Sequence, residues 1–242
     1  MKLTIERPVT VITPTIGSRK LLDAIESVKN QTYKCKHLIV VDGLEHAANV
    51  PGTDSDYMQV CYTPENTGGS GFYGHRIYAA YPHLINSDYI LFLDEDNWYE
   101  PDHVESLINT IESKKLDFAY SLRKIYDVDK TYLLEDNCES LGKWEIFASR
   151  NSPHGKHYLI DTSAYCFKRD FIVKTCHNWH YGWGGDRHYL YSVKDHAKYD
   201  TNGKHTLCYR LDGNQGSVNK AFFETGNKTQ EAYYGGRFPW KK

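Results

Sequence analysis

Three acidic residues follow one another at the end of an apolar run: Asp94, Glu95 and Asp96 come directly after the segment YILFL. Like charges this close cost free energy unless a positive group lies among them. Carboxylates are ligands that hard divalent cations such as Mg²⁺ and Mn²⁺ prefer. In an extended segment Asp94 and Asp96 would point to the same side, and Glu95 would point away or accept from a hydroxyl. The alternative is a solvated loop before a helix, where acids also favour the helix N-terminus.

The segments around these acids alternate between strand-like and helix-like patterns. Strands are expected where short apolar runs are bounded by turn-forming residues, at 9–13, 37–43, 57–62 and 88–93. Helices are expected from Ser18 to Val28, from the Gly-rich turn NTGGSGFYG to about Tyr81, and from Pro101 to Ile111. This order predicts an α/β fold with a mostly parallel central sheet flanked by helices.

The predicted sheet gathers polar residues at one of its edges. Ligands of parallel α/β sheets bind beyond the carboxyl ends of the strands. Thr13, Asp42, Asn66 and the three acids each follow or end an expected strand. We therefore expect these side chains to be neighbours in space.

The second half of the chain is less regular. Strands are expected at 118–126, 156–161 and 206–213, and helices at 169–176 and 185–193. From about residue 213 the composition becomes polar and rich in Gly and Asn, which predicts a C-terminal loop or arm over about 213–242.

The composition describes an ordinary globular protein of 242 residues, with 40% hydrophobic and 25% charged residues. A net charge of −2 gives no argument for a nucleic acid partner. The six cysteines include no C-x-x-C pair, which favours free thiols in a reducing compartment. No signal peptide is evident and no run approaches the roughly 18 apolar residues of a transmembrane segment, so a cytoplasmic location is expected.

Several motifs in order resemble family 2 glycosyltransferases of the GT-A fold. The stretch from VTVITPTIGSRK to HLIVVDG resembles the family's first strand, helix and second strand. NTGG resembles its nucleotide loop, YILFLDEDNWYEP its D-x-D segment, IDTSAYCFKRDFI its acceptor-side strand and helix, and GWGGDRHYLY its acidic motif. The resemblance implies a single GT-A domain with a Rossmann-like nucleotide-sugar half at about 9–100 and an acceptor half at about 101–212.

The resemblance also implies roles for individual residues. Asp186 would be the catalytic base, and Asp94 and Asp96 would ligate a Mn²⁺ or Mg²⁺ ion. A further metal contact would come from either His205 or Asp212. The residues implied to bind the nucleotide-sugar are Thr13, Pro14, Asp42, Asn66, Gly68, Gly69, Arg76, Asp94 and Glu95.

These roles imply an inverting transfer of a sugar from a nucleotide donor to a hydroxyl of a glycan or other acceptor. A divalent ion would neutralise the leaving diphosphate, and a carboxylate would take the proton of the attacking hydroxyl. A single acceptor-side carboxylate implies one displacement, hence inversion. UDP is expected as the nucleotide because it is the family's commonest one. A plain N-cap is the alternative role of Asp186.

Other functions are weighed beside this one. Gly69, Gly71 and Gly74 form a G-x-G-x-x-G, and Asp94 follows Gly74 by twenty residues, as in NAD-dependent Rossmann enzymes. Six residues separate the expected strand from Gly69, however, and a tight turn is required. A non-catalytic sugar-nucleotide or glycan-binding module is a second alternative. A nucleotidyltransferase is a third, although TPTIGSRK matches its Gly-rich loop poorly.

Trp179 and Trp183 flank the acceptor side and either stack on a sugar or pack in the core.

Overall fold

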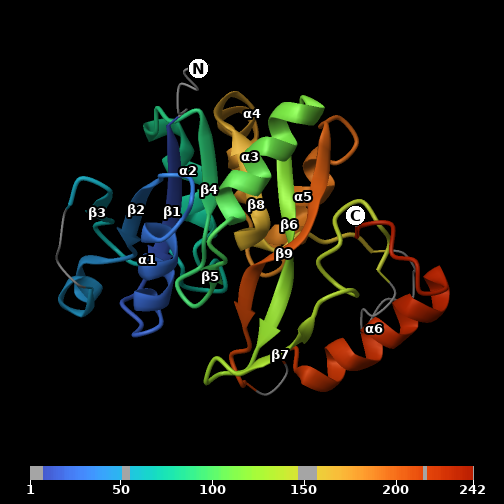
Figure 1. Ribbon diagram of the computed structural model, residues 1–242. Coiled ribbons are helices and arrows are strands. Elements are labelled where there is room, and N and C mark those ends of the chain that lie inside the picture. Colours follow the sequence, from blue (N-terminus) through green and yellow to red (C-terminus); the bar gives the residue numbers. More distant parts are fainter. Residues whose placement is uncertain (1–7, 51–54, 147–156, 215–216, 242) are drawn as a thin grey trace.

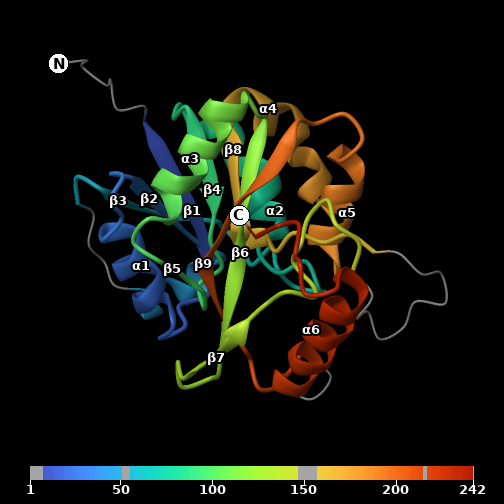
Figure 2. The same ribbon diagram turned by 45° about the vertical axis from the view of Figure 1, so that its right-hand side comes forward.

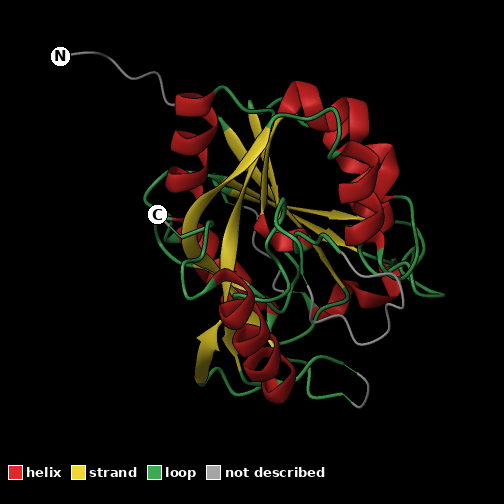
Figure 3. Cartoon of the chain, turned by 90° about the vertical axis from the view of Figure 1, so that its right-hand side faces the viewer, coloured by secondary structure: helices red, strands yellow, loops and turns green. Residues whose placement is uncertain are grey.

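A single curved sheet with helices on both sides organises the protein, as the computed structural model describes it for residues 8–50, 55–146, 157–214 and 217–241 (Figures 1 and 3). In these residues the strands are β1 (Val9–Thr15), β2 (Lys36–Val41), β3 (Met58–Tyr62), β4 (Tyr89–Phe92), β5 (Trp98–Tyr99), β6 (Phe118–Tyr126), β7 (Tyr132–Glu135), β8 (Tyr165–Lys168) and β9 (Tyr199–Arg210). The α-helices are α1 (Leu21–Lys29), α2 (His75–Ala80), α3 (His103–Lys114), α4 (Arg169–Thr175), α5 (Gly185–Val193) and α6 (Lys220–Tyr234). Short 3₁₀ helices are η1 (Leu44–Asn49), η2 (Tyr81–Leu84), η3 (Thr162–Ala164) and η4 (Cys176–Trp179).

The N-terminal half forms the parallel part of the sheet. Strand β1 lies between β2 and β4 and is parallel to both, and β2 is parallel to β3 on its other side. The strands β1, β2 and β4 are almost wholly buried, as expected where helices cover both faces. Their carboxyl ends meet at one edge of the sheet. The predicted α/β class and the predicted strand positions in this half are confirmed.

The second half extends the same sheet with mixed pairing. Strand β8 pairs antiparallel with both β4 and β6, and β6 runs parallel to β9. Strand β9 is longer than the predicted strand at 206–213 and begins at Tyr199. The segment TNG at 201–203 has the residue types of a turn, but it lies within β9. The pairing with β6 changes register at this point, and Gly203 has a φ of 75°. The predicted strand at 156–161 is wrong over its described part, where only His157 forms an isolated bridge, to Ile146; residue 156 lies outside the described residues.

The C-terminal segment differs from the expected loop or arm. Helix α6 covers 220–234, and Asn219 caps it by accepting a hydrogen bond from the N–H of Phe222 at 3.0 Å. The helix buries Phe223 completely, and the buried indole of Trp240 donates to Asn137 at 3.0 Å. The polar residues lie on the exposed face of α6. The helix itself lies beside the long strands, at the end of the sheet that carries β7 (Figures 1 and 2).

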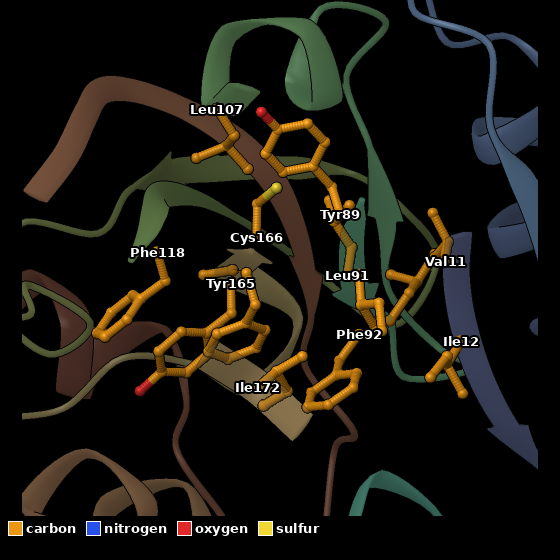
Figure 4. Packing of buried hydrophobic residues seen from close by; sticks show 14 of the residues in the cluster. Val11, Ile12, Tyr89, Leu91, Phe92, Leu107, Phe118, Tyr165, Cys166 and Ile172 are labelled. Atoms are coloured by element: carbon orange, nitrogen blue, oxygen red, sulfur yellow. The ribbon is translucent and has the colours of Figure 1, made fainter. Parts of the chain in front are cut away.

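The core lies between the sheet and its helices. Side chains of β1, β4, β6 and β8 fill it, and Phe92 and Phe118 are among its fully buried aromatic residues (Figure 4). Trp179 is also fully buried and packs 5.6 Å from Phe92 between ring centres, so it is a core residue. All six cysteines are free, four of them buried. Among the described residues, no helix has both the length and the apolar character that crossing a membrane requires.

Candidate active site

A pocket of about 530 Å³ opens beyond the carboxyl ends of β1, β2 and β4. Its position follows from the parallel pairing, because the loops that leave neighbouring strands diverge at this edge. The residues that line it are Pro14, Thr15, Ile16, Asp42, Asn66, Gly68, Gly69, Tyr73, Gly74, His75, Asp94, Glu95, Asp96, Asn97, Thr162, Tyr209, Arg210 and Asp212.

Most of the expected site residues meet in this pocket, and four do not line it. Thr13 is fully buried and its hydroxyl contacts His37 Nε2 at 2.9 Å instead. Arg76 donates to the carbonyl of Thr67 at 3.1 Å and thereby braces the Gly-rich loop. The remaining two are Asp186 and His205. Of the two candidates for a further metal contact, Asp212 lines the pocket and His205 does not.

His205 lies on β9 away from the pocket, with its Nδ1 3.6 Å from Glu135 Oε1. Burial lowers the pKa of His205, and the charge of Glu135 opposes this effect. The histidine therefore interacts with β7 and the C-terminal region.

Asp42 holds the Gly-rich loop in place. Its carboxylate accepts from the N–H of Thr67 at 2.7 Å and from the N–H of Gly68 at 2.8 Å. A side chain at Gly68 would lie 2.4 Å from the carbonyl oxygen of Tyr73, so only glycine fits this close approach. The loop runs from the end of β3 at Tyr62 to α2 at residue 75, which is far longer than the tight turn of a dinucleotide fingerprint.

The three acids form a turn instead of an extended segment. The N–H of Asn97 donates to the carbonyl of Asp94 at 3.2 Å, and this hydrogen bond closes residues 94–97 into a turn. All three carboxylates therefore line the pocket. Glu95 accepts from the hydroxyl of Thr15 and from the N–H of Ser18.

Asp94 is held from two sides. It accepts from the hydroxyl of Tyr78 at 2.8 Å and from that of Ser163 at 3.1 Å, and its own N–H donates to Ser163 Oγ at 3.0 Å. The pKa of Asp94 is raised to about 7, mainly by burial and also by the charges of Asp161 and Asp96, while the two hydroxyl donors oppose this shift. The carboxyl is thus fixed in position but is poorly compensated in charge.

Lys20 is the cation paired with Asp96 in the described residues, with its Nζ 3.9 Å from Asp96 Oδ2. Burial nevertheless raises the pKa of Asp96, and Lys20 only partly offsets the effect. A set of carboxylates with raised pKa values gains from a bound cation. Among the residues that the structure describes, however, no group of three or more His, Cys, Asp or Glu side chains is arranged as a ready metal site.

A buried charge network supports the pocket and was not anticipated from the sequence. Arg123 on β6 donates to Asp136 at 2.8 Å, to Asp161 at 2.7 Å and to Glu139. Asp161 in turn accepts from the N–H of Ser163 at 2.9 Å and so fixes the residue that holds Asp94. A single arginine inside the apolar strand FAYSLRKIY was the available signal, since a buried cation requires partners.

The network reaches the pocket a second time through an aromatic ring. The guanidinium of Arg123 lies 4.5 Å from the ring centre of Tyr209, which lines the pocket. This contact is a cation–π interaction. One buried arginine therefore supports the pocket from both β9 and η3.

Asp186 lies in the first turn of α5, next to the pocket wall. Its carboxylate accepts from the N–H of Arg187 at 2.7 Å, and burial raises its pKa. The preceding Gly185 packs against His75, since a side chain there would meet His75 Nδ1 at 2.5 Å. His75 lines the pocket, so the start of α5 packs directly against a residue of the pocket wall.

Comparison with known proteins gives the family and the fold of the chain. The sequence model "Glycosyl transferase family 2" matches residues 10–173. No curated protein matches the chain significantly. Similar solved structures include S. aureus TarS 1-349, with 13% identity, a TM-score of 0.57, and coverage of 84% of this chain and 60% of that one.

Two further structures are complexes of the same TarS fragment. Its complex with UDP has 14% identity, a TM-score of 0.57, and coverage of 84% of this chain and 60% of that one. Its complex with UDP-GlcNAc has 12% identity, a TM-score of 0.57, and coverage of 93% and 66%. At such identities the likeness concerns the fold, and this chain spans about 60% of the length of TarS 1-349. The family match, which covers more than half of the chain, identifies it as a member of glycosyl transferase family 2.

Proposed function

We propose that the protein transfers a sugar from a UDP-sugar to an acceptor hydroxyl with inversion at the sugar carbon. The observation that carries this proposal is the pocket at the strand ends, where Asp94, Glu95, Asp96 and Asp212 converge with the Gly-rich loop. Membership of glycosyl transferase family 2 supports the reaction class. The structurally similar TarS fragment was crystallised with UDP and with UDP-GlcNAc, which supports the choice of nucleotide.

The donor would bind mainly to the first half of the chain, about 9–100, and the acceptor to the second, about 101–212. Pro14, Asn66 and Gly69 line the pocket near the ends of β1 and β3 and would surround the nucleotide. Asp42 would act mainly through the loop that it holds, because its oxygens already accept from that loop.

A divalent cation, Mn²⁺ or Mg²⁺, fits the residues of the pocket. Asp96 would be its main ligand, because its carboxylate lines the pocket and its ion pair with Lys20 is long, at 3.9 Å. Asp94 and Asp212 line the same pocket and would contribute as ligands or through their charge. The raised pKa values of Asp94 and Asp96 support this assignment, because a cation would relieve the cause of the shift. The bound ion would neutralise negative charge on the leaving diphosphate.

Asp186 would accept the proton of the attacking hydroxyl. Its place at the start of α5, where Gly185 packs against His75, supports this role, because an acceptor lying at this edge of the pocket would be near Asp186. Burial raises the pKa of Asp186 toward neutral pH, and a general base works best when its pKa lies near the working pH. The helix N-terminus favours the ionised form that the reaction needs.

A thermal-shift panel tests the proposal directly. UDP, GDP, dTDP, CMP and NAD are each added with and without Mn²⁺. A ligand at about 100 times its dissociation constant stabilises the folded state by about 2.7 kcal/mol, which such a scan resolves. We expect a large shift with UDP that depends on Mn²⁺. A metal-independent shift with NAD alone would refute the proposal, and UDP binding without transfer to any acceptor would favour a non-catalytic binding module.

A further inference from the structure

Two loops that are distant in the sequence lie side by side next to the pocket. His75 Nδ1 contacts the carbonyl oxygen of Tyr181 at 2.8 Å. The rings of Phe72 and His180 have centres 5.5 Å apart, and a side chain at Gly182 would lie 3.6 Å from the carbonyl of Gly71. The loop before α2 and the loop before α5 therefore form one continuous surface.

This surface carries aromatic side chains that are exposed instead of packed. Tyr73 is 59% exposed, Tyr181 is 45% exposed and Trp183 is 77% exposed. Trp183 has the largest exposed fraction of the large hydrophobic side chains in the described part of the chain. We refer to Tyr73, Tyr181 and Trp183 as the aromatic rim.

The backbone keeps the rim in this position at a conformational cost. Tyr73 has a φ of 52°, a left-handed conformation that is unfavourable for a residue with a large side chain. Strain of this kind is typical of functional sites. Tyr181 is fixed differently, because its ring stacks on His188 with centres 4.0 Å apart and an interplanar angle of 7°. The ring of Tyr73 meets that of His75 edge-on, with centres 5.9 Å apart, so two of the three rings have a packing partner before any ligand binds.

The position of the rim indicates what it contacts. Tyr73 lines the pocket, and Trp183 precedes Asp186 by three residues, with Gly184 and Gly185 between them. The rim therefore extends from the proposed donor pocket to the proposed base, which is where an acceptor must lie. The rings alternate with glycine, histidine and charged residues, so the surface lacks the aliphatic side chains that a lipid chain would require.

We propose that the aromatic rim is a carbohydrate subsite, with a pyranose ring of the acceptor stacked on Trp183. A pyranose has an apolar face of C–H groups and a polar edge of hydroxyls. Tyrosine and tryptophan have the same combination, an apolar face and a polar edge group. The assignment of this sugar as the acceptor rests on the proposed function; the stacking itself does not.

Saturation-transfer NMR with defined sugars tests the subsite. The probes are tetrasaccharides of β-1,4-linked GlcNAc, β-1,4-linked glucose and α-1,4-linked glucose, each with the intact protein and with UDP and Mg²⁺ present. We expect ring protons of at least one probe to receive saturation. Trp183→Ala should weaken that binding by about tenfold, and Trp183→Phe should weaken it less because a flat ring remains. Tyr233→Ala removes an aromatic side chain on α6 that is 61% exposed and is the matched control.

The outcomes separate this inference from the proposed function. Retained UDP binding, with no saturation of any probe or with equal binding by wild type and Trp183→Ala, would overturn the subsite and leave the transferase proposal in place. Loss of sugar binding in Trp183→Ala, in a protein that binds no UDP, would support the subsite and refute the proposed donor. Equal losses in Trp183→Ala and Tyr233→Ala would show a general effect on the fold and overturn the assignment to Trp183.

Discussion

The charge of Asp94 should make the protein less stable as the pH rises. Its pKa is raised from its ordinary value of 3.8 to about 7, so the folded state holds this proton more tightly than the unfolded state does. Between these two values the folded state binds more protons, and the free energy of unfolding therefore falls with increasing pH. This loss of stability is complete above about pH 7, where Asp94 is ionised in the folded state as well. Substitution by Asn keeps the shape and removes the charge, so Asp94→Asn should lack this dependence.

The size of the effect follows from the same shift. Between pH 5 and the folded-state pKa of about 7 lie about two pH units, and at about 1.36 kcal/mol per unit they correspond to a loss of about 2.7 kcal/mol. Asp94 is only half-buried and lines the pocket, so solvent screening reduces this figure. When the pH rises from 5 to 8, we expect the free energy of unfolding of wild type to fall by about 1 to 2 kcal/mol more than that of Asp94→Asn.

Urea unfolding of the metal-free and nucleotide-free protein at pH 5 and pH 8 measures this difference. Asp195→Asn replaces an exposed carboxylate and is the control. The same Asp94→Asn variant should lose the stabilisation by UDP and Mn²⁺. A carboxylate that lowers the stability of the fold is expected to be kept because it serves binding. If wild type and Asp94→Asn respond identically to pH, the carboxyl is not held in the environment described and the reasoning fails.

Three further substitutions test other parts of the site. Asp186→Asn should lower turnover by about 100-fold or more, with UDP binding retained in calorimetry; a large loss of UDP affinity would contradict its role as base. Asp96→Ala should remove the Mn²⁺ dependence of UDP binding in a thermal shift, and a persisting dependence would place the metal elsewhere. Arg123→Ala leaves three carboxylates without their cation and should lower the free energy of unfolding in urea by about 3–5 kcal/mol. Lys204→Ala, which breaks an exposed ion pair with Asp102, should cost less than about 1 kcal/mol, and equal costs for the two would argue against the buried network.

The N-terminal half could be predicted well because its signals are local. Each strand from β1 to β4 is a short apolar run, and each helix has apolar residues at helical spacing, so neither needs knowledge of distant contacts. The parallel pairing then follows from the alternation, and it places Asp42 and Asp94 at one edge.

The second half was harder because its local signals mislead. Asn202 and Gly203 resemble a turn, yet pairing with β6 keeps them within β9. Residues beyond 213 appear polar, yet one face of α6 covers buried residues such as Cys138, which clusters with Phe223. In both cases tertiary packing outweighs local propensity.

The sequence by itself determined the family, the α/β order of the N-terminal half and the cluster of acids, since these depend on motifs and spacing along the chain. Only the tertiary structure decided how the acids are arranged and which candidates line the pocket. It placed Trp179 in the core and Trp183 at the surface, and it gathered Asp136, Glu139 and Asp161 around Arg123. These outcomes depend on contacts between segments far apart in the chain, and no local pattern encodes which buried charge will find which partner.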